Sequence, residues 1–374
     1  MKIFLAIGII VLLAIIAISI FAYRNLNYDY FNANFMNKTG YKLGFTENTA
    51  ILDDGSEIYC IEGPNNGPAL LLLHGQQASS FDYAKVLPEL SKEFHVYALD
   101  YYGHGKSSKD PEKYNAVAIG NDIIWFIENV IQDKVYISGH SSGALLAAYV
   151  SANAPEYIIA TVLEDGPFFS TLPGRAEKTI SWLGFKIMHD YLDQSEIDTF
   201  MEYALEHDYM QAVFNAKDPQ TWNQIIKDPA LRYMDKHPGE TPKIWLYPPE
   251  LGINSIYALN ASMQDGTGCY DLRFGVTFYN FSWFKGFDTE EILKNIQSPT
   301  IVMHVAPSKL TAPSYYDANG ILLAAMDETD AQRVVDLVPN SQYIGGFQSA
   351  HDIHADLPKE YIEVLLKLKD QIEP

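Results

Sequence analysis

The feature that most constrains the fold is a series of short, continuously apolar segments separated by segments with helical spacing. Residues 69–73 are five apolar residues in a row, and residues 95–99 are expected to be another buried strand after a helical stretch. A continuous apolar run is typical of a strand that is covered on both faces. Strands that alternate with helices along a chain predict a mostly parallel sheet with helices on both sides.

This alternation continues over most of the chain after residue 46. The expected strands are 50–52, 58–61, 69–73, 95–99, 135–138, 161–163, 300–304 and 343–344. The expected helices are 83–90, 118–130, 144–150, 334–337 and 361–368. Residues 168–297 break the rhythm, because they are mainly helical in pattern and hold four of the five tryptophans. They are predicted to be a helical lid inserted into a core made of residues 46–167 and 298–374.

The composition excludes several classes of protein. With 374 residues, 48% hydrophobic and 20% charged, the chain is not intrinsically disordered. Its net charge of −21 argues against a partner bound through nucleic-acid phosphates. No CxxC or HExxH motif occurs, so a zinc site has no support. The sequence implies no metal and no organic cofactor. Cys60 and Cys269 allow one disulfide and no disulfide framework.

The N-terminus begins with an apolar segment in which Ser19 is the one clearly polar residue between positions 3 and 23. A helix needs about 20 apolar residues to cross a bilayer, whereas the apolar part of a signal peptide is about 7–15 residues long. Residues 1–24 are therefore predicted to be an uncleaved transmembrane anchor, followed by a juxtamembrane segment at 25–45. The alternative is a long signal cleaved near Ala17-Ile18-Ser19, which would release a secreted protein.

The orientation of this anchor is set by two opposing signals. Lys2 lies on one side of the apolar segment, and Arg24, Lys38 and Lys42 lie on the other, which favours a cytoplasmic catalytic part. A very short tail before a signal-like segment favours export of the rest of the chain. We expect a single-pass membrane protein whose catalytic domain is extracytoplasmic.

The strongest chemical motif is Gly139-His140-Ser141-Ser142-Gly143, between an expected strand and an expected helix. A nucleophilic serine on a sharp strand-to-helix turn needs small neighbours, because the backbone folds back tightly there. Gly139 and Gly143 meet this need, so Ser141 is the candidate nucleophile. The alternative is a glycine-rich turn without chemistry.

A second motif, His74-Gly75-Gln76, follows the apolar strand at 69–73. Attack on a carbonyl builds negative charge on its oxygen, which preorganised N–H groups stabilise. The N–H groups of Gln76 and Ser142 are the candidate donors. The alternative is that His74 and Gly75 only shape a turn.

A serine hydroxyl is a weak nucleophile and needs a base whose pKa lies near the working pH. His351 lies between the last expected strand and the closing helix, where a catalytic base could reach the nucleophile. His354 is the alternative, although it fits the first turn of a helix. His95 and His304 are expected to be strand residues.

Together these segments resemble the α/β-hydrolase superfamily over the expected core. The segments that carry the resemblance, in the family's order, are His74-Gly75, residues 100–107, residues 139–143 and residues 351–358. The resemblance implies an eight-stranded, mostly parallel sheet with an inserted helical lid and a Ser–acid–His triad. It implies Ser141 as nucleophile, His351 as base, and Gln76 and Ser142 as oxyanion donors. The family often has glycine directly before its histidine, where this chain has Ala350.

The acid of the triad is not at its usual place. In the family it commonly lies in the loop after the strand expected at 300–304, but residues 305–309 contain no acid. Some members carry the acid at the end of the preceding strand, which here holds Glu164 and Asp165. Glu164 is the first candidate, Asp165 the second, and Asp317 or Asp327 the remaining ones. A helix-capping or hinge role is the alternative for the first two.

The residue at the strand-to-helix turn, named here the elbow, determines which chemistry the resemblance implies. Haloalkane dehalogenases and epoxide hydrolases of the superfamily have an aspartate there, whereas this chain has Ser141. Serine favours a hydrolase of carboxylic esters, carboxylesterase-like or lipase-like, that works through an acyl-enzyme. The aromatic lid suggests an apolar acyl or aromatic substrate, unless those side chains only pack the lid itself. The alternatives are acyl transfer, amide or carbon–carbon bond cleavage, and a non-catalytic, membrane-anchored binding module.

Overall fold

The computed structural model describes residues 2–263, 269–309 and 311–372. The chain forms two compact units, Met1–Tyr30 with Ser195–Met263, and Phe31–Gln194 with Gln264–Pro374. The expected lid at 168–297 is thus divided. Its two flanks belong to the unit that contains the sheet, and its middle forms a unit with the N-terminal helix.

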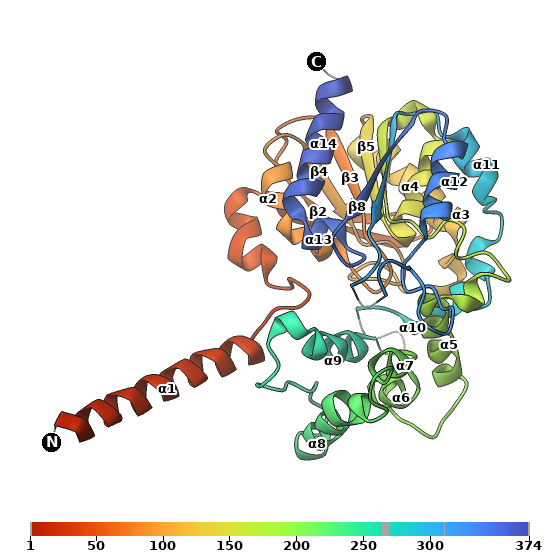
Figure 1. Cartoon of the computed structure of the whole chain (residues 1–374). Helices are drawn as coiled ribbons and strands as arrows, with labels where there is room; N and C mark the ends of the chain where they lie inside the picture. The colour runs from red at the N-terminus through yellow and green to blue at the C-terminus, as the bar shows by residue number, and fades with distance from the viewer. Residues whose placement is uncertain (1, 264–268, 310, 373–374) are drawn as a thin grey trace. The chain divides into compact units, whose positions relative to one another are not determined.

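The larger unit contains an eight-stranded sheet in the order β1-β2-β4-β3-β5-β6-β7-β8 (Figure 1). The strands are β1 Thr46–Ile51, β2 Glu57–Glu62, β3 Ala69–Leu73, β4 His95–Leu99, β5 Val135–His140, β6 Ile158–Glu164, β7 Thr300–Val305 and β8 Ser341–Phe347. β2 pairs antiparallel with β1 and β4, and all other pairs are parallel. This confirms the predicted α/β-hydrolase fold class.

The helices of the larger unit are α2 Leu87–Leu90, α3 Ala116–Phe126, α4 Ser142–Asn153, α5 Ile180–Leu192, α10 Leu272–Tyr279, α11 Thr289–Asn295, α12 Glu328–Leu337, α13 Ile353–Asp356 and α14 Pro358–Ile372. The five residues of β3 are fully buried, as their continuous apolar run predicts. Leu70 and Leu72 pack in one cluster with Tyr361 and Leu365 of α14. The central strand β3 is therefore covered by helices rather than facing water.

Two glycines bring α4 against the central strands. A Cβ atom at Gly143 would lie 2.2 Å from the carbonyl oxygen of Leu73 on β3. A Cβ atom at Gly139 would lie 2.1 Å from the carbonyl oxygen of Gly143. Neither backbone oxygen can move away without breaking the packing of its element, so both positions require glycine.

The smaller unit consists of helices with a core of their own. Its helices are α1 Lys2–Leu26, α6 Phe200–His207, α7 Met210–Phe214, α8 Asp228–Lys236 and α9 Ile253–Ser262. The buried cluster contains Met201, Leu205, Trp222, Ile226, Ala230, Ile253 and Tyr257. Part of the aromatic richness of the expected lid therefore serves internal packing.

The N-terminal helix α1 agrees with the apolar segment read from the sequence. The most apolar 18-residue window within Phe4–Leu26 has a mean hydropathy of 3.2, and none of that window is buried in the protein. By length and composition this helix can cross a bilayer.

The possible disulfide is not formed, since Cys60 is buried in β2, Cys269 is exposed, and both are free.

We predict that Gly143→Ala destabilises the protein while the matched change Gly184→Ala does not. Both glycines lie in helices, but a Cβ atom at Gly184 would meet no atom within 4 Å. Overpacking at Gly143 should cost about 1–3 kcal/mol, and Gly184→Ala should gain about 0.5–1 kcal/mol from helix propensity. Urea unfolding of the full chain in detergent measures both. Equal stability of the two variants would contradict the close approach of α4.

Candidate active site

The turn between β5 and α4 holds Ser141 in an uncommon backbone conformation. Its φ is 54° and its ψ is −122°, a region that costs a non-glycine residue about 1–3 kcal/mol. The N–H of Ser141 donates to the carbonyl oxygen of Glu164 on β6, 2.9 Å away. The neighbouring strand therefore holds the turn in place, and Ser141 lies at the carboxyl end of the parallel strands.

Asp165 follows β6 and binds two histidines. Its side chain is fully buried, and its Oδ2 atom lies 2.7 Å from Nδ1 of His351. Its Oδ1 atom lies 2.8 Å from Nδ1 of His304 on β7. The N–H of Asp165 donates to the carbonyl oxygen of Met303, 2.9 Å away, which fixes the backbone from which this carboxylate projects.

The ionisation of Asp165 and His351 follows from this contact. Burial raises the pKa of the Asp165 carboxyl, but hydrogen bonds from His304 and His351 outweigh it and hold the pKa at about 2. Burial lowers the pKa of His351, but the hydrogen bond and charge of Asp165 outweigh it and raise the pKa to about 9. Because the His351 side chain is 38% exposed, water screens part of this interaction. Asp165 is thus a carboxylate that favours the imidazolium form of His351.

The imidazole of His351 lies close to the serine turn. Its ring centroid is 4.4 Å from that of His140, the residue directly before Ser141. His140 is buried, and burial together with the neighbouring His351 lowers its pKa to about 3, so it is neutral. Ser141, Asp165 and His351 therefore gather at one edge of the sheet, where the parallel strands end.

The two candidate oxyanion donors lie beside this turn. Ser142 is the first residue of α4, so its N–H has no partner within the helix. A Cβ atom at Gly75 would lie 3.0 Å from Cβ of Ser141, which places the loop after β3 against the turn. Gln76 is the next residue in that loop, and the hydroxyl of Tyr270 donates to its Oε1 atom at 2.5 Å. This contact therefore holds the side chain of Gln76, which belongs to the same loop as the Gln76 N–H, the candidate oxyanion donor.

Comparisons with known proteins agree with this fold. A family profile described as the alpha/beta hydrolase fold matches residues 68–230. A hydrolase from Pseudomonas aeruginosa PA01 has a TM-score of 0.58 at 15% identity, over 86% of this chain and 98% of that one. A membrane phospholipase A, described as a bacterial virulence factor, has a TM-score of 0.55 at 18% identity, over 100% and 99%. The chain has the α/β-hydrolase fold.

The curated relatives of this α/β hydrolase match only part of it. Pheophytinase from Arabidopsis thaliana is 29% identical over 29% of this chain and 29% of its own length. In this relative and two others the match spans 22% to 33% of the relative's length. At these identities the solved structures show the fold alone, and function must be argued from the site.

The structure separates the four candidate acids of the hydrolase. Asp165 contacts His351, whereas Glu164, the first candidate from the sequence, contacts His354 through Oε1 at 3.0 Å. Asp327 caps α12 and pairs with Arg175. Asp317 accepts the N–H of Ile321 within its own turn. Of the two acids at the strand end, Asp165 therefore contacts the candidate base and Glu164 contacts His354, because consecutive side chains point to different neighbours.

Beside the candidate triad lies a second buried polar group. Among the described residues, Asp82, His140 and His354 form the one set whose ligand atoms could converge on a metal, within 4.8 Å of one another. However, Nδ1 of His354 lies 3.0 Å from Glu164, and Nε2 lies 3.1 Å from Asp82. Burial lowers the pKa of His354, but these two carboxylates outweigh it and raise the pKa well above its ordinary value. A protonated His354 thus balances the charge and keeps no lone pair for a metal.

This second group has a structural consequence for the site. The backbone N–H of His354 also donates to Glu164 Oε1, at 2.8 Å. Glu164 therefore binds the chain three residues after His351 and restrains the segment that presents the imidazole. The motif spacing did not reveal this role, because the sequence indicates His354 only as a first-turn residue of a helix or as the alternative base.

Two further residues of the site were missed by the sequence. His304 was expected to be an ordinary strand residue, yet it is the second histidine on Asp165. Tyr270 lies in the expected lid, and nothing in its local sequence points to Gln76. A histidine at the carboxyl end of a parallel strand was the one available signal for His304.

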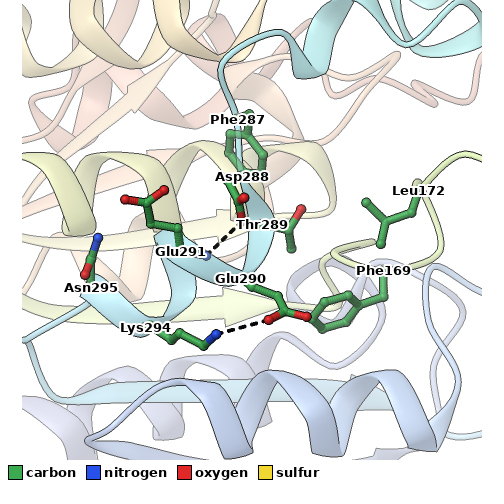
Figure 2. A pocket seen from close by; sticks show the side chains of 9 residues that line it. All are labelled: Phe169, Leu172, Phe287, Asp288, Thr289, Glu290, Glu291, Lys294 and Asn295. Atoms are coloured by element: carbon green, nitrogen blue, oxygen red, sulfur yellow. Dashed lines mark hydrogen bonds and ion pairs between the residues drawn. The ribbon is translucent and has the colours of Figure 1, made fainter.

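A hollow with a volume of about 580 Å³ lies along α11, separate from these residues (Figure 2). Its lining residues are Phe169, Leu172, Phe287, Asp288, Thr289, Glu290, Glu291, Lys294 and Asn295. Asp288 caps the helix, and Lys294 pairs with Glu290. These polar side chains stabilise α11, and none of the lining residues is a candidate for catalysis.

We predict that Asp165→Asn lowers the pKa of His351, which is about 9 in the unchanged protein. The hydrogen bond and charge of Asp165, the largest influence that raises this pKa, are then gone, and only Asp352 and Glu164 still oppose the effect of burial. In the unchanged enzyme His351 is protonated at pH 7, and its basic form grows as the pH rises toward 9. NMR titration of ¹⁵N-labelled histidine rings measures this.

Glu164→Gln is the matched control for that titration. It should lower the pKa of His354, whose imidazole it contacts, and shift His351 much less. An unchanged pKa of His351 in Asp165→Asn would show that this carboxylate is not its partner.

Proposed function

We propose that this α/β hydrolase is a serine hydrolase that cleaves carboxylic esters through a Ser141–His351–Asp165 triad. The observation that carries the proposal is the contact between His351 and the buried Asp165, beside a serine held at positive φ. A non-glycine residue at φ 54° is costly, and a sharp strand-to-helix turn of this kind is the one that exposes a nucleophilic serine hydroxyl.

In the first half of the reaction, Ser141 Oγ attacks the ester carbonyl carbon. His351 Nε2 takes the hydroxyl proton, and Asp165 stabilises the imidazolium through Nδ1. The carbonyl oxygen gains the electron pair of the broken π bond, and the N–H groups of Gln76 and Ser142 bind it. When the tetrahedral intermediate collapses, the alcohol leaves with the proton from His351, and the acyl group stays on Ser141.

In the second half, water replaces the alcohol. His351 takes a proton from the water, whose oxygen attacks the acyl carbon. The second tetrahedral intermediate expels Ser141 Oγ, which recovers its proton from His351. The products are one alcohol and one carboxylic acid, and the enzyme returns to its starting state.

The chemistry of the elbow favours this reaction over the others known on the fold. One curated relative is named bifunctional epoxide hydrolase 2, from Sus scrofa. The superfamily's epoxide hydrolases, as the resemblance implies, use a carboxylate at the elbow, whereas this chain has Ser141. A binding module would have no use for a strained serine, a paired imidazole and two directed N–H groups together.

We also propose that α1 is an uncleaved anchor that holds the hydrolase on a membrane, with the catalytic domain on the extracytoplasmic side. The helix is long enough, and nothing in the described protein covers its apolar window. An ester with an apolar acyl group would then be available from the bilayer or its surface.

Fluorophosphonate labelling of the purified full chain tests the nucleophile. We expect one adduct, mapped by peptide mass spectrometry to Ser141, because only an activated serine reacts. Ser141→Ala should abolish both the adduct and the turnover of short-chain p-nitrophenyl esters, with unchanged unfolding. Adducts on a different serine, or ester turnover retained in Ser141→Ala, would overturn the assignment.

Paired carboxylate variants test the acid. Asp165→Asn should lower kcat by roughly 10⁴-fold, the loss seen when a triad imidazole is left in the wrong tautomer. Glu164→Gln should lower kcat far less, because Glu164 restrains His354 rather than His351. Steady-state kinetics at pH 9 compare them. A larger loss in Glu164→Gln would restore Glu164 as the triad acid.

A further inference from the structure

The smaller unit fixes a loop to the end of the apolar helix. The side-chain Nδ2 of Asn25, in the last turn of α1, donates to the carbonyl oxygen of Trp245 at 2.7 Å. Asn25 is only 2% exposed, so this contact is buried. One residue earlier, Arg24 forms an ion pair with Glu250. Trp245–Leu251 (WLYPPEL), named here the 245–251 loop, is thus bound to the helix at both ends.

The loop is also held from within its own unit. Asn254, buried in α9, accepts the N–H of Ile244 at 2.9 Å and donates to its carbonyl oxygen at 3.0 Å. The hydroxyl of Tyr247 donates to the carbonyl oxygen of Ile225 at 2.8 Å. Pro248 and Pro249 restrict the backbone further. These contacts give the loop a defined conformation.

What this loop presents to the outside is apolar. Trp245 is 41% exposed, Leu246 56% and Leu251 59%. Trp222 and Trp283, by contrast, are fully buried. Glu250 is the one charged residue of the loop, and Arg24 neutralises it. An exposed tryptophan and two exposed leucines beside a neutralised charge indicate a surface that contacts a partner or a membrane.

The position of the loop along α1 indicates that it contacts a membrane. The apolar span Phe4–Leu26 has 23 residues, about 35 Å of helix at 1.5 Å per residue, against a bilayer core of about 30 Å. Arg24 and Asn25 lie in the last turn of this span, so residues bound to them lie at the edge of the bilayer. Tryptophan is enriched at that depth, because its ring is apolar and its N–H is polar.

We propose that the 245–251 loop is a peripheral membrane-contact surface, which seats Trp245, Leu246 and Leu251 in the headgroup region of the phospholipid bilayer that holds α1. The proposal rests on the membrane anchor of the proposed function. It adds that the helical unit touches the bilayer through a second, sequence-distant element and is held there by Asn25 and Arg24. Exposed apolar residues next to these contacts, Leu26, Tyr28 and Ile225, extend the same surface.

The test measures the depth of single residues in the full chain. In a Cys269→Ser background, where the remaining Cys60 is buried, one cysteine is introduced at a time. Leu246→Cys probes the loop, Leu13→Cys the middle of α1, and the exposed Lys236→Cys the end of α8. Each carries a nitrobenzoxadiazole label and is reconstituted into phosphatidylcholine vesicles with or without bromine on the acyl chains. Circular dichroism and gel filtration show that each variant is folded.

We expect strong quenching by brominated lipid at position 13, clear quenching with a blue-shifted emission at 246, and none at 236. Quenching at 13 with position 246 as unquenched as 236 would overturn the membrane contact and leave the anchor standing. A blue shift at 246 that is insensitive to bromine would assign the loop to a protein partner and also overturn it. No quenching at 13 would overturn the anchor itself.

Discussion

The contact on which the rest of the site depends is the approach of α4 to β3. A Cβ atom at Gly143 would lie 2.2 Å from the Leu73 carbonyl oxygen, so the two backbones touch directly. This closeness sets the first turn of α4, with the Ser142 N–H, beside the loop that carries Gln76. The same turn forces Ser141 to φ 54°, and β6 stabilises it by accepting its N–H. One backbone contact therefore positions the candidate nucleophile and the candidate oxyanion donors together.

The second organising element is the carboxylate of Asp165. A buried carboxylate is costly unless it is paired, and Asp165 is paired twice, with His304 and His351. Since His304 lies on β7 and His351 follows β8, one side chain joins the ends of three neighbouring strands. Glu164 adds a parallel restraint through His354. The imidazole of His351 is thus oriented by its own contact and by the restraint on the segment that carries it.

Much of the fold and part of the site could be predicted from the sequence. Continuous apolar runs located strands of the sheet, because a strand buried on both faces tolerates few polar residues. Small residues around Ser141 marked the elbow. The sequence could not predict which histidine Glu164 and Asp165 each contact. Neighbouring acids at a strand end are equivalent in sequence until their partners on β7 and α13 are known. The extent of the lid was also out of reach, since helical periodicity shows that a face is buried but not against what.

The sequence by itself determined the alternation of strands and helices, the tight turn at Ser141 and the apolar length of α1, because each depends on residues close together in the chain. Only the tertiary structure decided that Asp165 meets His351, that His354 is held by Glu164, and that Trp245 is bound to the end of α1. These contacts join residues 186, 190 and 220 positions apart. Their specificity comes from which side chains the packed backbone brings within about 3 Å, and no local pattern encodes that.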